Sequence, residues 1–299
     1  MRFEVLGPLQ VASDAWTAVP ITRRRLRELM SVLLLNANQP VPARTLSEML
    51  HDGEVPWSNA TLRGHVLQLR MTLRPADRIH TISGSYKFEV HPGELDREEF
   101  RDLYSKGRNC LRAGTYEKAE EYLAAACHLW REPPLADIPA TEAMKSTVDQ
   151  LIDQRSIAEE MLVDSRLASG QHRELLAELS TRSRANPTNE KVWRQLILAL
   201  YRSERKAEIF EVYAQLRKAL AEEYGVDPGR RLQELYEQVL HEDPALEYRP
   251  QLRALPHRSR TDRCPQSARW HPVNGIPVRR SMARGRVQGS TTSAKRSEQ

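Results

Sequence analysis

The stretch Ser58–Arg74, SNATLRGHVLQLRMTLR, predicts the helix around which the first part of the chain is organised. Four apolar residues recur at i, i+4, i+7 and i+11, which places them in one narrow stripe that faces a core: Leu62, Val66, Leu69 and Leu73. Ser58 or Asn59 can cap the start of this helix. The remaining surface carries three arginines and no acidic residue, so it suits a polyanion.

The flanking segments give this helix the context of a DNA-binding domain. Two short helices with apolar periodicity precede it, joined by a connection at residues 36–40, and residues 78–90 predict two strands around a Ser83-Gly84-Ser85 turn. Helix, helix, helix, hairpin is the order of a winged helix-turn-helix. The helix by itself is equally compatible with a solvated amphipathic helix in a small α+β domain. The order of the elements favours the DNA-binding domain.

The first of the two preceding helices has a basic end. Thr22 is expected to cap it, and its apolar positions have the spacing of one helical face: Leu26, Leu29, Met30, Leu33 and Leu34. Four arginines lie in its first turn, where positive charge opposes the helix dipole: Arg23, Arg24, Arg25 and Arg27. Phosphates of DNA would explain their presence, and the alternative is that they only make this end soluble.

The candidate DNA contacts lie on the basic helix end, the central helix and the hairpin. They are Arg23, Arg24, Arg25, Ser58, Asn59, Thr61, Arg63, His65, Gln68, Arg70, Arg74 and Lys87. The line of the central helix that points furthest from the core is small and apolar: Ala60, Gly64, Leu67 and Met71. Such groups can touch thymine methyls but cannot form bidentate hydrogen bonds to purines. Either the flanking polar residues read the bases, or the helix reads sequence weakly.

Length and composition predict a folded protein of about two domains, because 40% of the 299 residues are apolar. The longest apolar run, Val32–Leu35, is too short for a membrane span, and the start of the chain does not resemble a signal peptide. We therefore expect a cytoplasmic protein with no membrane partner. The three cysteines have neither the spacing of a zinc site nor the even number of a disulfide framework.

Charge is distributed unevenly along the chain. Residues 1–91 carry 11 basic and 8 acidic residues, residues 92–248 carry 22 and 30, and residues 249–299 carry 12 and 2. The balance therefore changes from +3 to −8 to +10. A basic N-terminal module, an acidic middle and a basic tail indicate a DNA-binding part joined to a part that contacts proteins.

From Leu95 onward the pattern is helical without a strand signal. Helices are expected at residues 95–112, 116–130 and about 142–169, with three to four more up to residue 240. Three residues recur at an offset of 34, the tetratricopeptide period: Ser169, Glu174 and Leu175 against Ser203, Glu208 and Ile209. The expected core of this part includes Trp193, Leu196, Leu200, Phe210 and Tyr213. Residues 249–299, rich in Arg, Pro, Ser and Gly, are expected to be disordered.

Several segments resemble the Streptomyces antibiotic regulatory proteins, which are related to the winged-helix part of OmpR. They are TRRRLRELMSVLLLNAN at 22–38, residues 61–73, ILALYRSERKAE at 197–208 and YGVDPGRRLQELYEQVLHEDPAL at 224–246. The resemblance implies a mixed fold, with an α+β winged helix-turn-helix at 1–91, an all-α, tetratricopeptide-like bacterial transcriptional activation domain at 95–248, and the tail. It also implies that paired protomers bind direct repeats in double-stranded promoter DNA of biosynthetic genes and engage RNA polymerase holoenzyme.

Two positions depart from the family pattern. His51 stands where the family usually has Trp after the second helix, and Glu204 stands where it has Gly in a helical turn. Glutamate is less suited than glycine to a left-handed helix cap.

Residues 1–91 alone are expected to bind promoter DNA without activating transcription.

Two other classes of function are weighed against a DNA-binding activator. An enzyme is disfavoured because the sequence has no P-loop, G-x-G-x-x-G, nucleophile elbow or H-E-x-x-H motif. No catalytic residue, cofactor or metal site is predicted. The other class is a tetratricopeptide-like scaffold that acts mainly through protein contacts. A scaffold should not bind duplex DNA, whereas a regulator should lose affinity for DNA steeply as salt increases.

Overall fold

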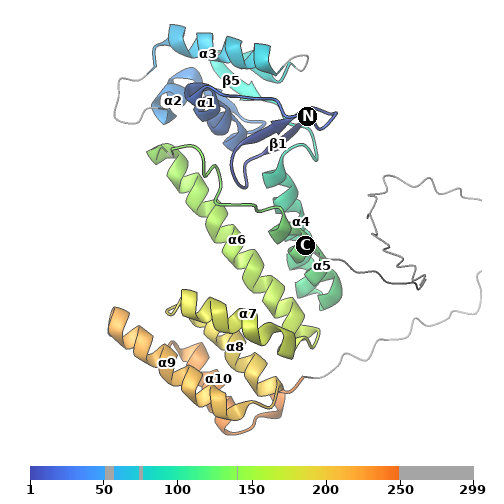
Figure 1. Cartoon of the computed structure of the whole chain (residues 1–299), viewed down its shortest axis with the longest axis vertical. Helices are drawn as coiled ribbons and strands as arrows, with labels where there is room; N and C mark the ends of the chain where they lie inside the picture. Colours follow the sequence, from blue (N-terminus) through green and yellow to red (C-terminus); the bar gives the residue numbers. More distant parts are fainter. Residues whose placement is uncertain (51–56, 74–76, 140, 249–299) are drawn as a thin grey trace, which may run out of the picture. The chain divides into compact units, whose positions relative to one another are not determined.

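The computed structural model describes residues 1–50, 57–73, 77–139 and 141–248. Its N-terminal part combines short strands with three helices (Figure 1): β1 Arg2–Glu4, β2 Gln10–Ala12, α1 Arg24–Leu35, β3 Pro40–Pro42, α2 Ala43–Met49, α3 Asn59–Thr72, β4 Ile79–Ile82 and β5 Ser85–Phe88. Strands β1 and β2 form an antiparallel hairpin in which Phe3 lies opposite Val11. The predicted order of three helices and a hairpin is confirmed.

A three-stranded antiparallel sheet in the order β3-β5-β4 forms the wing. Ser83 and Gly84 make its turn, with left-handed φ angles of 46° and 79°, as two-residue hairpins require. The sequence predicts only a connection at residues 36–40, whereas Pro40–Pro42 pairs with β5. This expectation was wrong because two prolines in three residues argue against a strand in the sequence. An edge strand tolerates them, since it forms hydrogen bonds to a neighbouring strand on one side only.

Helix α1 begins later than its expected cap. Arg23, not Thr22, is the N-cap, and no side chain caps the helix. The Glu28 carboxylate instead accepts hydrogen bonds from Arg24 at 2.7 Å and Arg25 at 3.1 Å, which offsets positive charge at this end. The five apolar positions expected on the core face are all buried, so the predicted orientation of the helix is confirmed.

Beyond the wing the elements are helices: α4 Asp96–Arg112, α5 Tyr116–His128, α6 Glu142–Ala168, α7 His172–Ala185, α8 Glu190–Arg202, α9 Lys206–Tyr224, α10 Arg230–Leu240 and the 3-10 turn η1 Pro244–Leu246. Helices α7 and α9 begin 34 residues apart, at His172 and Lys206. The turn before each contains a left-handed residue, Gly170 with φ 93° and Glu204 with φ 62°. The offset of 34 therefore relates equivalent helices of two successive helical hairpins.

Two hydrophobic cores stabilise these elements. The first extends from Phe3 to Ala158 and joins the winged helix to α4, α5 and the first part of α6, and the second extends from Val163 to Leu246. Phe3 meets Phe88 edge-to-face, with ring centroids 5.2 Å apart. The division between the cores lies within α6, not between residues 91 and 95, where the sequence pattern changes.

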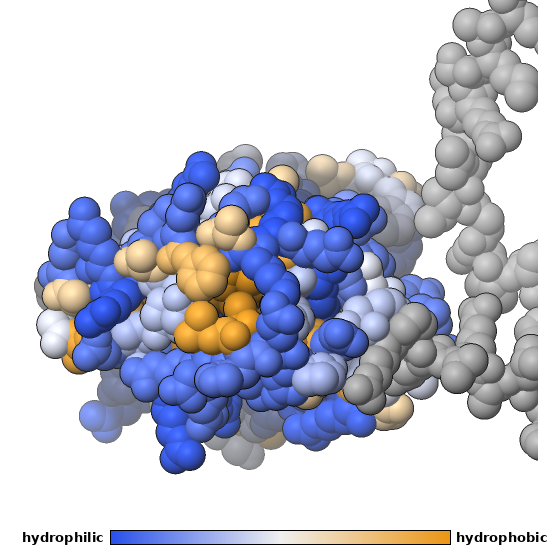
Figure 2. Space-filling view, turned by 90° about the horizontal axis from the view of Figure 1, so that it is seen from below, coloured by the Kyte–Doolittle hydropathy of each residue, from blue (hydrophilic) through white to orange (hydrophobic). Residues whose placement is uncertain are grey.

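Three of the five residues expected in the helical core are buried: Trp193, Leu196 and Leu200. Tyr213 is half-buried and stacks on Tyr236, with ring centroids 3.8 Å apart. The prediction for Phe210 was wrong, because this side chain is 47% exposed while its neighbour Ile209 occupies the core face of α9. Figure 2, viewed from the end at which α9 and α10 lie, shows apolar side chains at the surface among hydrophilic ones. The predicted tail, residues 249–299, lies outside the described residues.

Candidate nucleic-acid interface

Helix α3 is oriented by its cap and by its buried stripe. The Ser58 hydroxyl oxygen accepts a hydrogen bond from the Thr61 backbone nitrogen at 3.1 Å, which confirms Ser58 as the N-cap, and Asn59 is the first helical residue. The four apolar residues of the stripe are at most 1% exposed, so they fix the rotation of α3 against the core. The opposite face is exposed and includes Ala60, Thr61, Arg63, Gly64, Leu67 and Met71.

Arg63 is an exposed cation on this face of α3. Within the described ranges its guanidinium has no hydrogen bond or ion pair. Gln68, on the other flank of the face, is half-buried. A guanidinium without an intramolecular partner can bind guanine or a phosphate through two parallel hydrogen bonds. The geometry therefore suits the predicted role of Arg63.

The guanidinium of Arg70 contacts the wing. Its Nε and Nη2 donate to the Ile79 carbonyl oxygen at 2.9 and 2.5 Å, and Nη2 also donates to Thr81 Oγ1 at 2.9 Å. These bonds join α3 to β4 and leave fewer donors for DNA than the sequence suggests. The predicted contact Arg74 lies outside the described residues.

His65 packs beside Trp57 at the start of α3. Their ring centroids are 4.6 Å apart, and the Arg25 guanidinium carbon lies 5.8 Å from the centroid of the Trp57 ring. Burial, together with the charges of Arg25 and Arg23, lowers the pKa of the His65 imidazole. The imidazole is therefore neutral at neutral pH. This cluster links the start of α1 to α3, a contact that helical periodicity does not reveal.

The arginines at the start of α1 remain accessible although two of them are paired. Arg23 and Arg24 are exposed, and Arg25 is half-buried. Glu28 pairs with Arg24 and Arg25, yet 65% of the Arg24 side chain remains exposed. The spacing of three and four residues between these charges is the sequence signal for the pairing. Glu28 therefore holds two arginines in place at the surface.

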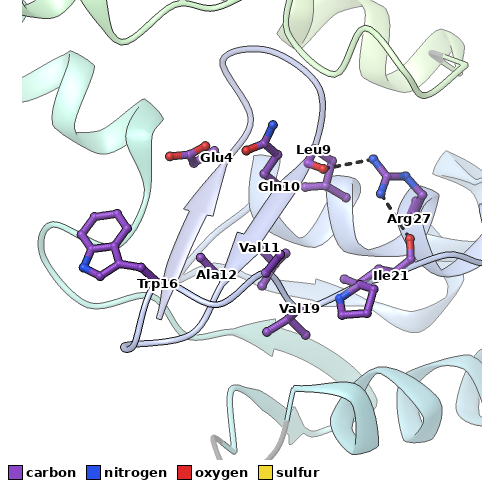
Figure 3. Close-up of a pocket in the computed structure, with 11 residues that line it drawn as sticks. Glu4, Leu9, Gln10, Val11, Ala12, Trp16, Val19, Ile21 and Arg27 are labelled. Atoms are coloured by element: carbon purple, nitrogen blue, oxygen red, sulfur yellow. Dashed lines mark hydrogen bonds between the residues drawn. The ribbon is translucent and has the colours of Figure 1, made fainter.

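Arg27, from the same helix end, belongs to a different site. It lines a recess of about 380 Å³ beside the β1–β2 hairpin, where its guanidinium donates to the carbonyl oxygens of Leu9 at 3.0 Å and Ile21 at 3.2 Å (Figure 3). It also pairs with Asp137. These contacts explain why an arginine stands at position 27 without any contact to DNA. Asp137 is far from Arg27 in the sequence, and the fold brings the two together.

Lys87 lies on β5, the central strand of the wing. It stands opposite His80 of β4 and Pro40 of β3 and is half-buried. The exposed tip of the wing is formed instead by Ser83 and Gly84. Lys87 therefore projects from the sheet rather than from the turn, although both are on the wing.

No group of three His, Cys, Asp or Glu within the described residues could hold a metal ion. None of the helices described here is long and apolar enough to cross a membrane. Burial raises the pKa of the Cys127 thiol to about 11, which keeps it protonated and unreactive.

Three helices with a β-wing, followed by stacked helical hairpins, define the class of winged-helix transcription regulators. Residues 95–240 match the family model of the bacterial transcriptional activator domain. The regulatory protein DnrI of Streptomyces peucetius is 31% identical over 258 residues, which cover 83% of this chain and 94% of DnrI. The regulatory protein AfsR of Streptomyces coelicolor is 36% identical over 248 residues, which cover 82% of this chain and 25% of AfsR.

A solved structure shares this fold. Mycobacterium tuberculosis EmbR, in complex with a low affinity phosphopeptide, superposes with a TM-score of 0.76 and 29% identity, covering 81% of this chain and 65% of the EmbR chain. The chain thus spans nearly all of DnrI but only part of AfsR and of EmbR. It belongs to the Streptomyces antibiotic regulatory protein family and is a transcriptional activator.

Proposed function

We propose that the chain activates a secondary-metabolite gene cluster, such as one for an antibiotic, by sequence-specific binding of α3 to promoter DNA. The observation that carries this proposal is the exposed face of α3, which has no acidic residue and presents Arg63, a cation with no partner in the part of the chain that the structure describes. Its orientation is set by the buried stripe on the opposite side. Membership of the Streptomyces antibiotic regulatory protein family, which rests on the likeness to DnrI over 94% of that protein, supports the role in an antibiotic cluster.

The proposed contacts divide between bases and backbone. Helix α3 enters the major groove with Thr61, Arg63 and Gln68 near base edges, while Ser58 and Asn59 at its N-terminus approach phosphates. The side chains proposed to contact the DNA backbone from other positions are Arg23, Arg24, Arg25, Arg74 and Lys87. The last two residues proposed for the DNA-binding surface are His65, which packs beside Trp57, and Arg70, which contacts the wing. Both hold α3 in position.

The helical part, residues 95–248, is proposed as the activation module. The balance of −8 over residues 92–248 disfavours contact with phosphates and favours a protein partner, which we propose is RNA polymerase holoenzyme. Two protomers would bind adjacent direct repeats about one DNA turn apart. The protein would act in the cytoplasm without cofactor or catalytic chemistry.

Binding of the full chain to promoter fragments of biosynthetic genes, measured at several salt concentrations, tests this proposal. The expected result is a sequence-specific complex whose log affinity falls linearly with log salt, with a slope of about one unit per phosphate neutralised. A tetratricopeptide-like scaffold, the second candidate, would bind no duplex at any salt concentration. A reporter assay with the same promoter then measures activation.

A further inference from the structure

The outermost line of α3 is apolar over its second half. Leu67 is 58% exposed and Met71 is 56% exposed, one turn further along the helix, and both lie opposite the buried stripe. The first half of the same line is formed by Ala60 and Gly64, which present almost no side chain. The free energy of the system falls when another apolar group covers exposed apolar side chains of this size.

Packing within the free protein does not require a glycine at position 64. A Cβ atom at this position would meet nothing within 4 Å. Glycine weakens a helix by about 1 kcal/mol relative to alanine, which is about a fivefold change in an equilibrium constant. A glycine in the middle of an exposed face lets a second molecule approach the helix backbone closely. That molecule would meet Gly64 and Leu67 together, because they are three residues apart.

The groups around this line favour DNA as the molecule that covers it. Arg63 lies on one flank and Gln68 on the other, and α3 has no acidic residue. A stable protein interface buries about 800 Å² on each partner, more than two apolar side chains between polar flanks provide. The apolar group that the major groove offers is the C5-methyl of thymine.

We propose that Leu67 and Met71 read thymine methyl groups in the major groove, and that Gly64 lets α3 approach the bases closely enough for this contact. The rise between Leu67 and Met71 is about 6 Å, or about two base-pair steps. The two methyls therefore belong to thymines about two base pairs apart. This inference rests on the proposed function and adds the base that the apolar line recognises.

The test uses the tightest duplex that the full chain selects from a random library. Each thymine is replaced in turn by deoxyuridine, which removes the methyl group and keeps every hydrogen-bonding group of the base. The wild-type protein should lose about fourfold in affinity at one or two positions, which corresponds to about 0.8 kcal/mol for one buried methyl. Binding without any deoxyuridine effect would overturn this inference but not the proposed function, whereas failure to select any duplex would overturn both.

Three variants assign the effect to residues. Leu67→Ala and Met71→Ala should each abolish the deoxyuridine effect at one position, and Leu240→Ala, which removes a leucine 50% exposed on α10, should leave both effects intact. An effect that persists in both α3 variants would show that other groups read the methyls and would contradict the proposal. Gly64→Ala should raise the unfolding midpoint yet weaken DNA binding. Unchanged binding by this variant would exclude the close approach.

Discussion

Both carboxylate oxygens of Asp96, the first residue of α4, lie 2.9 Å from the backbone nitrogen of Val5, 91 positions earlier in the chain. The same carboxylate accepts a hydrogen bond from the backbone nitrogen of Leu6 at 2.9 Å. The Arg131 backbone nitrogen donates to the Leu6 carbonyl oxygen at 3.0 Å, and that of Leu135 donates to the Gly7 carbonyl oxygen at 2.7 Å. The N-terminal hairpin is thus paired with the helical part, and the two share one core.

This shared core predicts that residues 1–91 do not form a stable domain alone, contrary to the expectation from the sequence. Truncation after residue 91 would remove Phe100 and Trp130 from the core and leave the backbone nitrogens of Val5 and Leu6 without Asp96. A fragment of residues 1–162, which ends between the two cores, should unfold cooperatively, bind promoter DNA and fail to activate transcription. Thermal melting followed by circular dichroism compares the fragments. A cooperative transition for residues 1–91, with equal DNA affinity, would refute this view.

Asp96 also predicts a pH dependence of stability. Burial raises the pKa of its carboxyl from 3.8 to about 6, despite the hydrogen bonds from Leu6 and Val5. The folded protein binds the proton of this carboxyl more tightly than the unfolded chain does. The resulting contribution of Asp96 to the free energy of unfolding is therefore fully present below pH 3.8 and is lost as pH rises through about 6.

The Asp96→Asn variant isolates this contribution. Relative to the variant, the wild-type protein should lose about 2 kcal/mol in free energy of unfolding between pH 4 and pH 7, out of about 3 kcal/mol over the full range, since one pKa unit corresponds to about 1.4 kcal/mol. Urea denaturation of both proteins at several pH values measures the difference. A difference that stays constant over this range would show that Asp96 is ionised throughout.

Helical periodicity was a reliable guide to the buried faces of α1 and α3, whereas on α9 it placed Phe210 in the core that Ile209 occupies. It located the stripe of α3 from Leu62 to Leu73, and the polar residues before the stripe offered Ser58 or Asn59 as the cap, of which Ser58 caps the helix. Long-range pairs were beyond its reach, because nothing local in the sequence relates Arg27 to Asp137 or Asp96 to Val5. For the candidate site, the sequence found the basic face of α3 but could not show that Arg70 contacts the wing.

Glu204 predicts a stabilising substitution. Its φ of 62° is left-handed, a conformation that costs a side-chain-bearing residue roughly 1 kcal/mol and suits glycine. Glu204→Gly should therefore raise the free energy of unfolding by about 0.5 to 1 kcal/mol. The control Glu222→Gly, at an exposed position within α9, should lower it by about 1 kcal/mol. Equal effects of the two variants in urea denaturation would show that the left-handed conformation of Glu204 does not destabilise the protein.

Arg70→Ala should loosen the wing. The variant loses the hydrogen bonds to Ile79 and Thr81 and leaves a carbonyl oxygen with fewer donors, at a cost of about 1 to 2 kcal/mol in stability. Because the wing is displaced rather than a base contact removed, affinity should fall about equally for all DNA sequences. Denaturation and gel-shift titrations on two unrelated duplexes measure these effects. A changed sequence preference with full stability would instead make Arg70 a base-reading residue.

Arg63, whose guanidinium has no partner among the described residues, is the residue at which to test whether the exposed face of α3 reads promoter DNA. The full chain and its Arg63→Ala variant would each select duplexes from the same random library, with thermal unfolding as the folding control. We expect the variant to keep the unfolding midpoint of the full chain, to change its preference at one or two base pairs, and to lose about 1 to 3 kcal/mol of binding free energy on the wild-type site. The same selected motif with unchanged affinity would contradict this expectation.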